Sequence, residues 1–142
     1  MTDKMEKLYV DQINAKMAQV SMRLANFENP KSFDQIAKNC DAIFLTLNQI
    51  KEIQKTCPSI NMDPSPDSII SMIEKTRDIR ATNFAIAVAG VNIEKAKAIS
   101  SDKKRAKLLD EAKMLIIDAK NLVRGQEYLD KLEAKMAELK SL

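Results

Sequence analysis

The sequence predicts an all-α protein: an antiparallel four-helix bundle or coiled coil, built of two helical hairpins with an extended C-terminal helix. Two observations support this prediction. The 142 residues include only two Gly and four Pro, and Ala, Lys, Glu, Leu, Ile and Met dominate, which favours long helices over sheet. Apolar residues also recur at alternating spacings of three and four, which places them along one face of a helix.

The length indicates one helical domain over residues 1–142, long enough to bury a core without metals or disulfides. We expect helical hairpins over about 3–56 and 66–141, joined by a proline-rich loop at 57–67. No secretory signal is apparent at the start of the chain. The longest apolar run, Phe84 to Val91, is far below the roughly 20 residues that cross a bilayer. These features and two cysteines without an expected disulfide predict a cytoplasmic protein.

Two capping pairs mark the first two helices. Asp3 with Glu6 predicts the first helix start, and Ser32 with Gln35 predicts the second. The first helix should end around Asn29 and Pro30, because proline disfavours helix in the residue before it. The apolar positions are Val10, Ile13, Met17, Val20, Leu24 and Phe27 in the first helix, and Phe33, Ile36, Cys40, Ile43, Leu47 and Ile50 in the second.

The third helix should begin at Ser65 and Pro66, since serine suits the N-cap and proline the first helical position. Ala81, Ala85 and Ala89 stand four residues apart, and such small side chains let another helix approach closely. Gly90, next to this row, either serves that close contact or marks a bend.

The last helix should begin after a break and cap at Ser100, Ser101 and Asp102. Leu108, Leu115, Leu122, Leu129 and Met136 then recur every seven residues. Gly125 could end this helix after Arg124, but the seven-residue row keeps its phase across the glycine. The pattern therefore favours a continuous or mildly kinked helix of roughly 40 residues, about 60 Å long.

Such a helix would project beyond the bundle from about Gln126 and expose an apolar stripe that a partner should cover. A second copy of the chain is the simplest cover, which predicts a homodimer. The run from Met114 to Ile117 would cover most of the helix circumference, so Met114 and Ile117 require either a central position in the bundle or contact with a second chain. The expected interface residues are Leu122, Leu129, Leu132, Met136, Leu139, Met114 and Ile117.

Sites for catalysis are not apparent in the sequence. The chain has no histidine, no glycine-rich phosphate loop and no calcium-loop motif. Asp110 and Glu111 are neighbours on a helix, so their side chains point in different directions. We therefore expect no catalytic residue, no cofactor and no metal. The predicted function is a non-enzymatic protein–protein interaction module: an adaptor, scaffold, assembly chaperone or inhibitor.

An alternative function rests on the basic start of the last helix. Lys103, Lys104, Arg105 and Lys107 would suit phosphate groups of nucleic acid or of an anionic membrane. No aromatic residues are interleaved for base stacking. The net charge of +3 comes from largely interspersed charges and gives no strong field. Nucleic acid and membrane therefore remain the second hypothesis, behind a protein partner.

Overall fold

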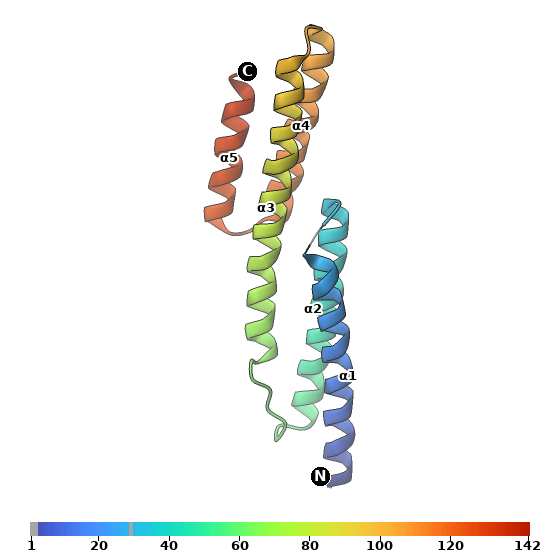
Figure 1. Ribbon diagram of the computed structural model, residues 1–142. Helices are drawn as coiled ribbons and strands as arrows, with labels where there is room; N and C mark the ends of the chain where they lie inside the picture. The colour runs from blue at the N-terminus through green and yellow to red at the C-terminus, as the bar shows by residue number, and fades with distance from the viewer. Residues whose placement is uncertain (1–2, 29) are drawn as a thin grey trace. The chain divides into compact units, whose positions relative to one another are not determined.

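The computed structural model describes residues 3–28 and 30–142, and this part of the chain is helical without a strand (Figure 1). The all-α class is therefore confirmed. The finer prediction of an antiparallel four-helix bundle is not confirmed, because the described residues form five helices. These are α1 (Asp3–Phe27), α2 (Phe33–Thr56), α3 (Pro66–Ala98), α4 (Asp102–Leu122) and α5 (Gln126–Lys140).

The chain divides into two compact units, Met1–Glu74 and Lys75–Leu142. The boundary lies inside α3, whereas the sequence suggested the loop 57–67 as the place where two helical pairs meet. The first unit therefore contains α1, α2 and the first turns of α3. The second contains the rest of α3 with α4 and α5.

In the first unit, α1 and α2 lie side by side, and the chain reverses direction between them (Figure 1). The Lys16 ammonium donates to Gln49 Oε1 at 2.9 Å across the pair. Most of the predicted apolar positions are buried, but Val10 is exposed and Met17, Leu24 and Phe33 are half-buried. The buried residues are Ile13, Val20 and Phe27 of α1 and Ile36, Cys40, Ile43, Leu47 and Ile50 of α2.

The start of α2 confirms the predicted capping pair. The hydroxyl of Ser32 accepts from the Gln35 amide at 3.1 Å, and Gln35 Oε1 accepts from the Lys31 amide at 2.7 Å. The predicted cap at Asp3 lies outside the described side chains. Asn29, at the predicted end of the first helix, lies outside the described residues, and α1 ends at Phe27.

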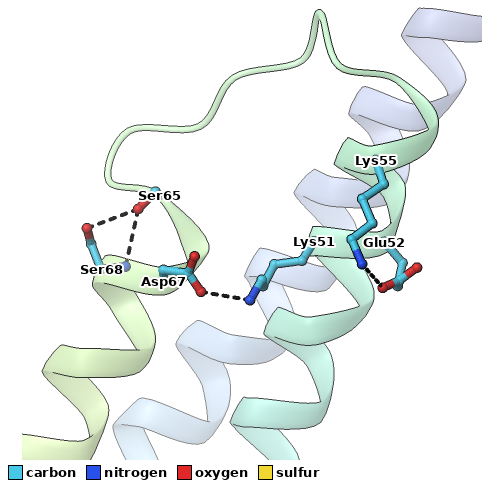
Figure 2. A network of polar contacts seen from close by, with 6 residues as sticks. All are labelled: Lys51, Glu52, Lys55, Ser65, Asp67 and Ser68. Atoms are coloured by element: carbon cyan, nitrogen blue, oxygen red, sulfur yellow. Dashed lines mark hydrogen bonds and ion pairs between the residues drawn. The ribbon is translucent and has the colours of Figure 1, made fainter.

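The start of α3 at Pro66 is also as predicted. Ser65 Oγ accepts from the Ser68 amide at 3.2 Å, so serine caps the helix that proline opens (Figure 2). Asp67, in the first turn, forms an ion pair with Lys51 of α2 at 2.8 Å (Figure 2). A carboxylate at this end of the helix also complements the helix dipole.

In the second unit, α3 and α4 are held together near the turn that joins them. Asn92 Nδ2 of α3 donates to the carbonyl of Leu108 in α4 at 3.2 Å. Ser101 caps α4 as predicted, accepting from the Lys104 amide at 3.4 Å. The row Ala81, Ala85 and Ala89 is fully buried.

The close contact suggested for Gly90 is wrong. No neighbouring atom lies within 4 Å of the position that a Cβ would take there, and α3 continues through this residue as a regular helix.

The prediction of one continuous last helix is also wrong. Residues 123–125 separate α4 from α5, and the cause lies on α3. The buried carboxylate of Asp78 accepts from the Arg124 amide at 3.2 Å and from the Gly125 amide at 2.8 Å. In an uninterrupted helix these amides would donate to carbonyls four residues earlier. Asp78 replaces those acceptors, so the chain can leave the helix without burying unsatisfied amides.

Because of this break, α5 turns back and packs alongside α4 (Figure 1). Lys120 of α4 and Glu133 of α5 form an ion pair between the two helices. Leu132, Met136 and Leu139 are buried. The predicted projecting tail with an exposed apolar stripe is therefore wrong, because the chain itself covers these side chains.

Candidate functional site

The second unit has an open groove of about 1060 Å³ between α3 and α4. Apolar side chains line its floor, and charged side chains line its middle and its two ends. We call it the α3–α4 groove. Its lining residues are Val88 and Asn92 of α3, with Lys103, Lys104, Ala106, Lys107, Asp110, Glu111, Met114, Leu115 and Asp118 of α4.

The helical repeat of α4 explains why these side chains share one face. Ala112, Ile116 and Ala119 point inward and are fully buried. The groove is lined by side chains on another face of α4, from Lys103 to Asp118, a distance of about 22 Å at 1.5 Å per residue. The groove is therefore as long as four turns of a partner helix.

Apolar side chains are exposed on this face of α4. Met114 is 55% exposed and lines the groove, and Ile117, one helical turn further, is 42% exposed. Between them, Ile116 is buried and Leu115 is half-buried. The sequence predicted that the whole run from Met114 to Ile117 needs cover, and this chain supplies cover for only part of it.

The other predicted interface residues lie elsewhere. Leu122 and Leu129 are half-buried on α4 and α5, and Leu132, Met136 and Leu139 are buried. The structure therefore does not bring the seven predicted residues together on one exposed surface. Met114 and Ile117 are the two that it leaves exposed.

The four predicted basic residues also divide into two groups. Lys103, Lys104 and Lys107 line the groove and are exposed. Arg105 instead donates from Nε to the Ala96 carbonyl at 3.3 Å and from Nη2 to the Ile99 carbonyl at 2.7 Å. Carbonyls at the end of a helix lack partners within it, so Arg105 stabilises the end of α3.

The rest of the groove is acidic. Asp110 and Glu111 line its middle and Asp118 its far end, and these carboxylates and the three lysines form no ion pair with the residues that the structure describes. The groove thus carries three cations at its first end, two anions at its middle and one at its far end. Sequence reasoning missed the acidic part, although Asp110, Met114 and Asp118 follow the helical spacing that places them on one face.

The hollows described in the first unit differ from this groove in their charges. A hollow of about 720 Å³ near the turn between α1 and α2 is lined mainly by polar residues, and its Lys38 and Asp34 are paired at 2.9 Å. A smaller one of about 270 Å³ on α2 contains Lys51 and Lys55, which pair with Asp67 and Glu52 (Figure 2). The α3–α4 groove combines an apolar floor with charges that lack such partners.

Residues 3–28 and 30–142 contain no group of three or more Cys, Asp or Glu side chains arranged to hold a metal ion. Among the helices of this part of the chain, none has the length and apolar character needed to cross a membrane. Cys40 and Cys57 are buried free thiols.

Fold and groove together define an all-α protein with an amphipathic groove between two helices. No protein-family model, curated protein sequence or solved structure is significantly similar to this chain.

Proposed function

We propose that the protein is a non-enzymatic protein–protein interaction module, an adaptor, scaffold, assembly chaperone or inhibitor, and that the α3–α4 groove binds a helix. The observation that carries the proposal is Met114. Its side chain is 55% exposed in a groove whose neighbouring charges of both signs are unpaired within the described chain.

The physical argument starts from the apolar floor. Burying apolar surface stabilises a complex by about 25 cal/mol per Å², so a helix that covers Met114, Leu115 and Val88 gains affinity there. Charges at the rim add orientation and selectivity more than affinity. A partner helix of about 15 residues matches the 22 Å length at 1.5 Å per residue.

A synthetic helical peptide tests this proposal. The peptide has an apolar stripe at spacings of three and four, acidic residues at one end and basic residues at the other. We expect fluorescence anisotropy to give a Kd of roughly 1–100 μM, the weak affinity of a short isolated helix. Peptides with the same stripe but only acidic or only basic residues should bind at least about tenfold weaker, since each then faces like charge at one end.

The matched protein variants are Met114→Asp in the groove and Met22→Asp on α1, where the methionine is 71% exposed. The first should abolish peptide binding and the second should leave it unchanged. Equal binding by both variants, or no binding of the mixed-charge peptide to the protein when it is a single chain in solution, would contradict the proposal.

A second candidate function is binding of anionic nucleic acid or membrane, favoured by the three unpaired lysines in one groove. The carboxylates of Asp110, Glu111 and Asp118 in the same groove oppose it, because they repel phosphate. Flotation with phosphatidylserine vesicles and a DNA mobility shift test this candidate. Binding that is lost in the variant Lys103→Glu/Lys104→Glu/Lys107→Glu would support it, and no binding by the unaltered protein would exclude it.

A further inference from the structure

We infer that the helix bound in the α3–α4 groove is α4 of a second copy, and that the two α4 helices pack antiparallel about a two-fold axis. This inference rests on the proposed function, because it takes the groove to be a helix-binding site and names its occupant. It also retains the homodimer predicted from the sequence but assigns it a different surface, since Leu132, Met136 and Leu139 are buried within the chain.

Charge order along α4 supports the antiparallel arrangement. Exposed cations occupy the first end of the groove, at Lys103, Lys104 and Lys107, and exposed anions follow at its middle, Asp110 and Glu111, and at its far end, Asp118. Reversing one copy brings the lysines at the first end of each helix toward Asp118 at the far end of the other. A parallel arrangement would instead place like charges opposite one another, which is unfavourable in an interface.

The sizes of the side chains on α4 support one particular register of the antiparallel pair. With the two-fold axis near Asp110, Lys103 lies opposite Asp118 of the second copy, and Ala106 lies opposite its Met114. Ala106 is exposed and is the smallest side chain that α4 contributes to the groove, so it leaves room for the long methionine. The two-fold axis repeats each contact, so both Met114 side chains are covered.

This arrangement closes on itself. A two-fold interface uses the same surface on both copies, so no second groove remains open for further copies. The exposed Met114 of each copy is covered, and Lys103 of each copy meets Asp118 of the other in one step. Asp110 and Glu111 lie next to the axis, about one helical turn from Lys107 of the second copy. The surface is therefore complete in the dimer and incomplete in the single chain.

The test is the solution mass of the full chain, measured by light scattering coupled to gel filtration over a tenfold concentration range. One chain has a mass of 16.0 kDa, and we expect the unaltered protein to have twice that value. Variant K is Lys103→Glu/Lys104→Glu/Lys107→Glu, and variant D is Asp110→Lys/Glu111→Lys/Asp118→Lys. Each alone should be monomeric, with a dimer Kd raised at least about 100-fold, because all facing charges then repel.

The decisive sample is an equimolar mixture of variants K and D. The acidic groove of one then faces the basic groove of the other, and we expect the mass to return to twice that of the chain. A matched control, Lys4→Glu/Lys7→Glu, reverses exposed charges on α1 and should remain dimeric. Circular dichroism shows whether each variant is as helical as the unaltered protein.

Three outcomes would overturn the inference: a monomeric unaltered protein, dimers that neither variant dissociates, or a mixture that stays monomeric. The peptide experiment separates these failures from failure of the proposed function. If the protein is monomeric but Met114→Asp still abolishes peptide binding, the groove binds a helix from another protein. If the peptide also fails to bind to the monomeric protein, both proposals fall.

Discussion

The starts of α2 and α5 are stabilised in different ways. At α2, the capping groups come from the same turn, where Ser32 accepts from the Gln35 amide and Gln35 accepts from the Lys31 amide. Gly125 at the start of α5 has no side chain to offer, and the amides there are held by Asp78, 47 residues earlier in the chain. The first start depends on local sequence, whereas the second depends on the packing of α3 against the turn.

This difference explains which helix boundaries could be predicted. The serine caps at Ser32, Ser65 and Ser101 lie next to the helices they start, so the sequence reveals them. The seven-residue row through Leu122, Leu129 and Met136 fits both a continuous helix and two helices that fold together. Only the contact with Asp78 decides between these alternatives, and no local pattern contains it.

The largest expected effect comes from Asp78→Ala. It leaves the Arg124 and Gly125 amides without their buried acceptor, and it also removes the ion pair with Arg77 at 3.2 Å. We expect the free energy of unfolding to fall by about 3 kcal/mol in urea denaturation. Asp67→Ala is the control, because its ion pair with Lys51 is exposed and should contribute less than about 1 kcal/mol. Equal losses for the two variants would contradict the role given to Asp78.

The two glycines test the comparison further, because replacement by alanine should destabilise the protein at Gly125 and stabilise it at Gly90. At Gly125, the new Cβ would lie 3.0 Å from Asp78 Oδ2 and 3.0 Å from Tyr128 Cδ2. We expect Gly125→Ala to lower the melting temperature, at a cost of about 1–2 kcal/mol for overpacking. At Gly90 the space is empty, so Gly90→Ala should raise stability by up to about 1 kcal/mol through helix propensity. Stabilisation by both variants would show that the turn does not need glycine.

The smallest effect is expected at the local cap. Ser32→Ala removes the acceptor of the Gln35 amide, which should cost about 1 kcal/mol in the same denaturation experiment. Ser21→Ala, at an exposed position inside α1, provides the control and should not destabilise the protein. If Ser32→Ala cost as much as Asp78→Ala, the distinction between the two helix starts would be wrong.

The groove shows the same division between local and long-range information. Lys103, Lys104 and Lys107 were predicted as a patch because they are close in sequence, and they line one end of the groove. Arg105 belongs to the same run but bonds to the Ala96 and Ile99 carbonyls, since its position on the helix turns it toward α3.

For the predicted apolar interface, sequence identified buried faces correctly but not the helix that covers them. Because α5 folds back, Leu132, Met136 and Leu139 lie in the core, and Met114 lies in an open groove. The periodicity of apolar residues identifies a helix face that is buried by another element. Whether the cover comes from the same chain depends on where the chain turns.

The most direct test of the α3–α4 groove as an interaction surface is a dilution series of ¹H–¹⁵N NMR spectra of the full chain. It reports which backbone amides change environment as copies associate. We predict concentration-dependent shifts along α4 from Lys103 to Asp118 and at Val88 and Asn92 of α3, with α1 unchanged. Shifts centred on α1 or α2, or spectra that do not depend on concentration, would contradict self-association through this groove.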